Sequence, residues 1–332
     1  MIKITKSDFK ILKAVPKSLN YSEISRITGF SQPYVSNKIK KLRRKFLFSF
    51  RVDLHSLNII PVTVFIKNKD QVKSSDFVYK TRAVTLSTGK YLAMDMYVPK
   101  NMLEEISQTF SREEVQIIPK RYEVLWRPDT NNLFRYEKGR MLFSFNLRDK
   151  YYGLTGYREG ERRSFIADPI DMLIIWSKMQ NPFVPLASIA RKVGLSQQLV
   201  SYHYRHHVIG QWMYNGVIAK YLQNDNLTLL IKILTISSVS ALKMLELLQR
   251  IPFFLESFVP INDYKSIFTW LAAPHSIIKC LINSFHEIEE IEMVEILGIC
   301  DPPTEKIRTF PWRDINSFRS LIKAGKHEKI SI

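Results

Sequence analysis

The residues of this sequence best suited to contact a polyanion lie in one short segment, residues 31–45, SQPYVSNKIKKLRRK. Val35, Ile39 and Leu42 recur there at steps of three and four residues, which predicts a helix with one buried face. The remaining positions carry amides, hydroxyls and cations that can hydrogen-bond to nucleic-acid bases or neutralise phosphates. The alternative is a solvated basic helix in an ordinary helical domain.

The early turns of this helix would face base edges, because amides pair with adenine and lysine pairs with guanine O6 and N7. These candidates are Gln32, Tyr34, Ser36, Asn37 and Lys38. The later cations would hold phosphates and set the register of binding. These candidates are Lys40, Lys41, Arg43 and Arg44, with Arg51 from the segment that follows.

Neighbouring segments must position this helix. A short helix over residues 21–28 precedes it, Gly29 supplies the turn, and Ser31 caps the second helix. The alternating residues 46–57 predict a small wing of two paired strands. Residues 1–60 are therefore expected to form a winged helix-turn-helix, whose second helix enters the DNA major groove.

The distribution of charge agrees with this expectation. The 332-residue chain has a formal net charge of +18, and its residues 1–60 hold thirteen lysines and arginines against three acidic residues. More than half of the excess therefore lies on the predicted helix-turn-helix. A basic charge concentrated in this way indicates a polyanionic partner, and we expect double-stranded DNA.

Residues 61–126 show the order strand, helix, strand, strand, helix, strand, which predicts a ferredoxin-like sandwich. The expected elements are strand 61–67, a weak helix 70–80, a hairpin of 83–87 and 91–98 that turns at Gly89, helix 99–110 and strand 115–126. Residues 127–165 are polar and basic, and we interpret them as a connector with one hairpin around residues 141–152.

The pattern then repeats. Residues 189–207, IARKVGLSQQLVSYHYRHH, align with residues 24–42 at a constant offset of 165. We expect a second winged helix-turn-helix over 166–226, a second ferredoxin-like domain over 227–300 and a tail over 301–332. The predicted fold is thus α+β, with two winged helix-turn-helix domains alternating with two βαββαβ sandwiches in a pseudo-dimer.

The second recognition helix carries few fixed charges, so it should bind phosphates more weakly than the first. Its candidate contacts are Gln197, Gln198, Tyr202 and Arg205. His203 and His207 are four residues apart, a spacing that can ligate a metal. However, no cysteine or carboxylate lies near them in sequence, and His207 aligns with the core residue Leu42. We therefore expect no metal.

Three features bear on the compartment. No apolar run reaches the roughly 20 residues of a membrane helix. The N-terminal residues lack the apolar core of a secretory signal. Cys280 and Cys300 are too few for a disulfide framework. These features predict a cytoplasmic protein without a membrane partner.

Three segments resemble the Lrp/AsnC (feast/famine) transcription regulators: GFSQPYVSNKIKKL at 29–42, VDLHSLNIIPVTVFI at 52–66 and STGKYL at 87–92. Members of that family pair through their sandwich domains. The resemblance therefore implies that the two sheets of this duplicated chain pack face to face. It also implies regulation of transcription, with a small-molecule effector of unspecified chemistry as an open partner.

We therefore expect a sequence-specific DNA-binding transcription regulator, active as a homodimer on a palindromic site. We expect neither enzymatic activity nor a cofactor, because the sequence shows no glycine-rich phosphate loop, nucleophile elbow or paired catalytic carboxylates. Two alternatives remain open. One is an enzyme similar to the siroheme decarboxylases, which share this domain order. The other is an architectural protein that coats DNA without sequence preference.

Overall fold

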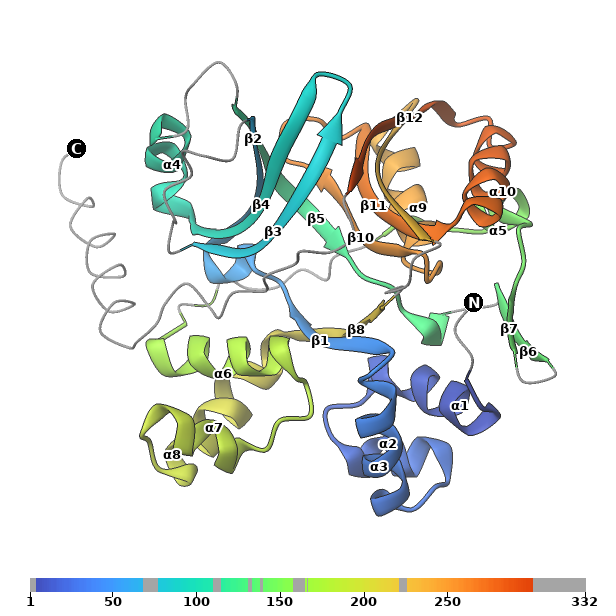
Figure 1. Cartoon of the computed structure of the whole chain (residues 1–332). Helices are drawn as coiled ribbons and strands as arrows, with labels where there is room; N and C mark the ends of the chain where they lie inside the picture. The colour runs from blue at the N-terminus through green and yellow to red at the C-terminus, as the bar shows by residue number, and fades with distance from the viewer. Residues whose placement is uncertain are drawn as a thin grey trace.

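The computed structural model describes residues 4–67, 77–109, 115–130, 133–137, 140–157, 165, 167–220 and 226–300. Two groups of helices lie at one end of the molecule and a barrel of strands lies at the other, with a two-stranded ribbon between them (Figure 1). Within these ranges, no helix has both the length and the apolar character needed to cross a membrane.

The first helix group consists of α1 (Lys6–Ala14), α2 (Tyr21–Thr28) and α3 (Gln32–Leu42). Asn20 caps α2 by accepting a hydrogen bond from the backbone N–H of Glu23 at 3.0 Å. Gly29, at φ +73°, ends α2 in the left-handed conformation that glycine tolerates best. Ile39 and its neighbours on one face of α3 are buried against α1 and α2. The two helices and the glycine turn therefore form where the sequence predicts them.

The prediction that two strands within residues 46–57 pair with each other as a wing is wrong. β1 (Phe46–Val52) does not pair within that segment but runs antiparallel to β8 (Trp212–Ala219) from the second half of the chain. The physical reason is that β1 spans two cores: Phe48 packs with the first helix group, whereas Phe50 packs with the second. Its partner strand therefore comes from the second half, and the two halves share one ribbon.

The second helix group consists of α6 (Pro169–Gln180), α7 (Leu186–Val193), α8 (Gln197–His203) and a π-helical turn (Tyr204–Val208). Gly194 has φ +70° and ends α7 in the same conformation as Gly29. The backbone turn of the first group thus recurs in the second.

The barrel is closed and its neighbouring strands are antiparallel, in the order β10-β11-β9-β12-β3-β4-β2-β5. Its first four strands in the chain are β2 (Ile59–Lys67), β3 (Val78–Leu86), β4 (Gly89–Pro99) and β5 (Val115–Val124). The later four are β9 (Asn226–Thr235), β10 (Phe254–Pro260), β11 (Ser266–Pro274) and β12 (Ile291–Cys300). The two sets join edge to edge, through β5 with β10 and β3 with β12. This joining corrects the expected face-to-face packing of separate sheets.

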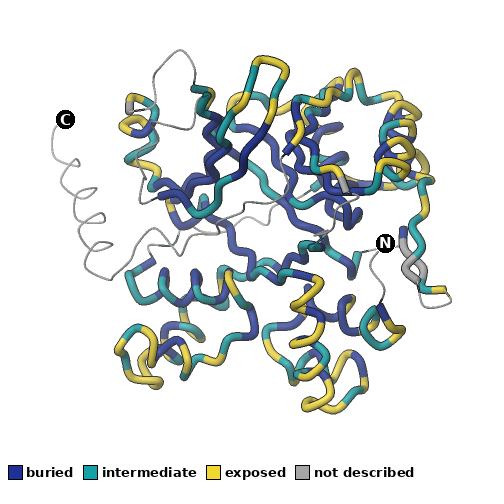
Figure 2. The backbone as a smooth tube through the Cα atoms, in the orientation of Figure 1, coloured by how far each residue is buried: buried dark blue, intermediate teal, exposed yellow. Residues whose placement is uncertain are grey.

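Helices cover the outside of the barrel, and most of its strands are largely buried, whereas β12 and the β3–β4 turn are mostly exposed (Figures 1 and 2). These helices are α4 (Leu103–Thr109), α9 (Ser238–Leu248) and α10 (His275–His286). The apolar faces of α9 and α10 pack on the later strands, with Met244, Leu281 and Phe285 fully buried.

The connector differs from its prediction. Its hairpin is formed by β6 (Phe134–Glu137) and β7 (Arg140–Phe143), and α5 (Leu147–Tyr152) follows where the second strand of the hairpin was expected. Asn146 caps α5 by accepting from the backbone N–H of Asp149, a local signal for a helix. The predicted weak helix 70–80 lies mostly outside the described residues, and its residues 78–80 belong to β3. The tail 301–332 also lies outside them.

Candidate nucleic-acid interface and inner cavity

The face of α3 opposite its core is exposed. The exposed candidates are Gln32, Tyr34, Asn37, Lys40, Lys41, Arg43 and Arg44, while Ser36 and Lys38 are half-buried. The last turn of α3 and the three residues after it hold a dense group of cations. Nine of the ten first-half candidates are thus exposed or half-buried on α3 and the two residues that follow it.

Contacts with α1 hold the early part of this surface in place. Lys38 Nζ lies 2.9 Å from Asp8 Oδ1, and the Tyr34 hydroxyl lies 3.1 Å from Ser7 Oγ. Partial burial opposes ionisation of Asp8, but hydrogen bonds from Thr5 and Lys38 outweigh it and keep the pKa of Asp8 below its usual value. Lys38 is therefore an anchored cation whose position is fixed before any partner arrives.

Arg51 does not lie on this surface. Its side chain is buried, and its Nη2 lies 2.6 Å from Glu123 Oε2 on β5. Burial raises the pKa of Glu123, and the Arg51 guanidinium opposes that rise. A guanidinium enclosed in this way cannot reach a phosphate, so the expected contact from Arg51 is corrected to an internal ion pair.

The second recognition helix is shorter and less charged. Gln197, Gln198, Tyr202 and Arg205 are all exposed, and the Tyr202 ring lies against the His206 ring with centroids 4.6 Å apart. Arg205 is the one fixed charge among these four candidates. Helices α3 and α8 both lie at the end of the molecule opposite the barrel, and the β1–β8 ribbon connects the groups that carry them (Figure 1).

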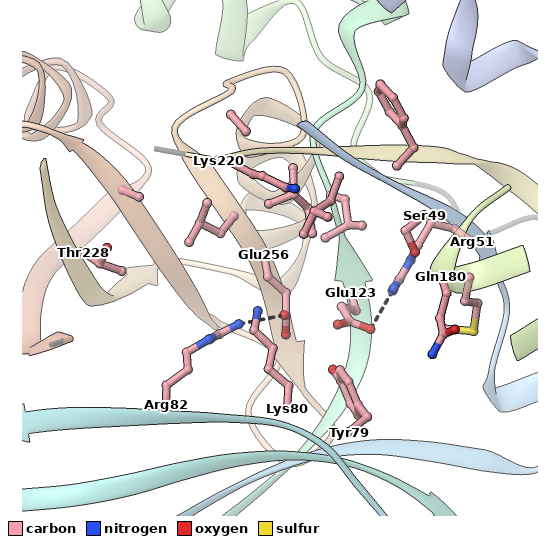
Figure 3. A pocket seen from close by; sticks show the side chains of 18 of the residues that line it. Ser49, Arg51, Tyr79, Lys80, Arg82, Glu123, Gln180, Lys220, Thr228 and Glu256 are labelled. Atoms are coloured by element: carbon pink, nitrogen blue, oxygen red, sulfur yellow. Dashed lines mark hydrogen bonds and ion pairs between the residues drawn. The ribbon is translucent and has the colours of Figure 1, made fainter. Parts of the chain in front are cut away.

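A cavity of about 350 Å³ lies between this ribbon and the barrel. Its charged lining includes four cations and two carboxylates: Arg51, Lys80, Arg82, Lys220, Glu123 and Glu256. Aromatic and apolar side chains complete the wall, among them Tyr79, Tyr97 and Trp176. Figure 3 shows Arg82 directed at Glu256 and Arg51 at Glu123 across this space. The excess of cations in the lining suits an anionic ligand.

A buried ion network lies behind the cavity wall. Lys120 is fully buried and reaches Asp95 Oδ1 at 3.1 Å, and Arg82 Nη2 lies 3.3 Å from Glu256 Oε2. Burial opposes ionisation of Glu256, but Lys120 and Arg82 hold its pKa well below the usual range. The carboxylate of Glu256 is therefore charged and fixed in place.

Sequence reasoning missed this cavity. A signal was present, because Asp95 and Glu256 each interrupt a strand that is otherwise largely apolar. A charge inside a buried strand requires a partner. The partners come from strands far apart in the sequence, so the residues could have been suspected singly but not assembled.

The sequence matches no family model and no curated protein. Among solved structures, siroheme decarboxylase NirDL is similar over 97% of this chain and 100% of its own, with 13% identity and a TM-score of 0.52. The same enzyme in co-complex with an iron-uroporphyrin III analogue gives 13% identity, a TM-score of 0.53, and coverage of 96% and 99%. AsnC of E. coli matches 42% of this chain and 95% of its own, with 22% identity and a TM-score of 0.30.

The comparison corrects one expectation. We expected no enzymatic activity, yet the full-length match is to an enzyme, so that expectation is overturned. At 13% identity the match establishes a shared fold and nothing about particular residues. The chain has, over nearly its whole length, the fold of siroheme decarboxylase NirDL.

Proposed function

We propose that this protein is a sequence-specific transcription regulator that binds double-stranded DNA through α3. The supporting observation is the exposed surface of α3, where amides and cations lie together at the end of the molecule away from the barrel. Gln32 and Asn37 suit base edges, and the later cations suit phosphates. The exposed surface of α8 acts as a second, weaker DNA-binding surface. Two copies of the chain are expected on a palindromic site.

The test is the salt dependence of binding to duplex DNA, measured by fluorescence anisotropy. The double variant Lys41→Ala/Arg44→Ala should weaken binding to all sequences alike. It should also reduce the slope of log K against log salt by about 2, because each lost phosphate contact removes about 0.9. Gln32→Ala should instead weaken binding to the preferred sequence more than to others.

The matched control is Lys265→Ala/Lys279→Ala, which removes the same charge from exposed positions on the barrel side. If this control lowers the affinity and the slope as much as the α3 variant does, the net charge of the protein drives binding. In that case α3 is not the DNA-binding helix. Absence of any salt-dependent binding to duplex DNA would contradict the proposal.

A second candidate function rests on the cavity and on the full-length fold match. We infer that the cavity binds a carboxylate-bearing tetrapyrrole and that the protein is a decarboxylase similar to NirDL. The excess of cations in the lining supports this candidate, since tetrapyrrole carboxylates need such partners.

This candidate is tested by titrating the purified protein with siroheme and following the absorbance, with carbon dioxide release as a second readout. Lys80→Gln, in the cavity wall, should weaken binding about tenfold, which corresponds to loss of a charge-assisted hydrogen bond of about 1.4 kcal/mol. Lys90→Gln, at the exposed tip of the same hairpin, is the control. An unchanged spectrum on addition of siroheme would exclude this function.

A further inference from the structure

Four potential metal ligands converge in the second helix group. Asp168 and Asp171 lie at the start of α6, while His203 ends α8 and His207 lies in the π-helical turn. One donor atom from each lies within 4.8 Å of the other three. The sequence suggested the two histidines by their spacing but could not supply the carboxylates, which lie more than thirty residues earlier in the chain.

The distances between these atoms approach those of a metal site. His203 Nδ1 lies 2.9 Å from Asp171 Oδ1 and 3.2 Å from Asp168 Oδ2, and His207 Nδ1 lies 3.1 Å from Asp171 Oδ1. Tetrahedral zinc with bonds of about 2.0–2.2 Å needs donor atoms about 3.3–3.6 Å apart. Small outward shifts of a few tenths of an ångström would therefore admit an ion.

The carboxylates are already oriented by the backbone of α6. Asp168 Oδ1 accepts from the backbone N–H groups of Ile170 at 2.8 Å and Asp171 at 2.9 Å. Asp171 Oδ2 accepts from the backbone N–H of Asp168 at 3.1 Å. Asp168 thus uses Oδ1 to cap the helix and turns Oδ2 toward His203, whereas both oxygens of Asp171 lie near an imidazole, Oδ2 being 3.2 Å from His207 Nδ1. Hydrogen bonds of this kind fix the orientation of the ligands in metal sites.

Hydrogen bonds from both rings to Asp171 account for most of the cluster and leave one close contact over. His203 Nδ1 faces two carboxylate oxygens but carries at most one hydrogen, so it cannot donate well to both. Asp171 is buried, with 1% of its surface exposed, and Oδ1 of this residue is approached by both rings. A cation among the four atoms would satisfy all of them at once.

We propose that Asp168, Asp171, His203 and His207 bind one divalent transition-metal ion of the zinc class. Two imidazoles and two carboxylates suit Zn²⁺ or Co²⁺, and the two negative charges balance the ion. A fourth protein ligand closes the coordination sphere, which is typical of a structural site. Binding through Nδ1 requires each ring to carry its hydrogen on Nε2.

The first helix group suggests what the ion does. Under the repeat offset of 165, His203 corresponds to Lys38, and Lys38 ties α3 to α1 through its ion pair with Asp8 at 2.9 Å. In the second group the equivalent link between α8 and α6 is the contact of His203 with Asp171 at 2.9 Å. A bound ion would replace this contact with metal–ligand bonds and so hold α8 on α6 more firmly.

The test is a titration of the metal-free full-length chain with Co²⁺, followed by the visible absorption that distinguishes tetrahedral from octahedral cobalt. We expect one tetrahedral Co²⁺ per chain, displaced by Zn²⁺ and not by Mg²⁺. His207→Gln should weaken binding by about 100-fold or more, since loss of a residue that only hydrogen-bonds to a ligand already costs about 10–100-fold. His206→Gln, an exposed neighbour outside the cluster, should bind as the unaltered chain does.

A second variant guards against misfolding. Asp168→Asn keeps a good helix cap and removes one charged ligand, so the metal-free melting temperature should hold while affinity falls at least about tenfold. Octahedral cobalt, equal affinity in the His206 and His207 variants, or unchanged affinity in Asp168→Asn would each overturn the proposal.

Discussion

Arg44 and Arg51 lie seven residues apart and have opposite environments. Arg44 is exposed beyond the end of α3, whereas Arg51 is buried and paired with Glu123. What buries Arg51 is β8 and β5, and its partner Glu123 on β5 lies 72 residues later in the chain. Local pattern could therefore identify the cations but not assign them to surface or interior.

Substitution of Arg51 tests this assignment. Arg51→Met should lower the free energy of unfolding by about 3–5 kcal/mol, because removing one member of a buried ion pair leaves the other charge unpaired. The measurement is equilibrium denaturation in urea. Arg51→Met/Glu123→Gln should recover part of the loss. If Arg51→Met instead weakens DNA binding at unchanged stability, the side chain contacts phosphate after all.

At the scale of elements, the helices of both helix groups could be predicted because their signals are local. A cap, a glycine turn and a three- and four-residue apolar period all lie within residues 20–46. The ribbon and the barrel closure could not be predicted, because β1 with β8 and β3 with β12 pair strands that lie far apart in the sequence. Alternation of apolar and polar residues identifies a strand but does not show with which other strand it pairs.

The contact between ribbon and barrel gives an element-scale prediction. A Cβ added at Gly216 on β8 would lie 2.6 Å from Leu125 Cδ1 and 2.7 Å from Leu125 Cβ. Gly216→Ala should therefore lower the melting temperature, with a loss of about 1–3 kcal/mol from overpacking. Gly210→Ala has open space around it and is the control. Equal effects of the two substitutions would show that Gly216 is not needed for close packing.

At the scale of the whole molecule, the cavity lies where the two halves meet. Its wall includes Arg51 from β1 and Lys220 just after β8, together with Arg82 and Glu256 from the barrel. A ligand there would contact the barrel and, at the same time, the ribbon that connects the two helix groups. The cavity could not be predicted from the sequence because no single segment supplies more than a fraction of its wall.

The shared ribbon also affects how substitutions accumulate in the two helix groups during evolution. Where two identical subunits each supply one helix group, a substitution in the gene alters both groups together. Here β1 and β8 belong to one polypeptide, so each helix group is encoded by its own part of the gene. Each group can therefore acquire substitutions independently of the other. The cation-rich α3 and the histidine-bearing α8 are the kind of divergence that this covalent linkage permits.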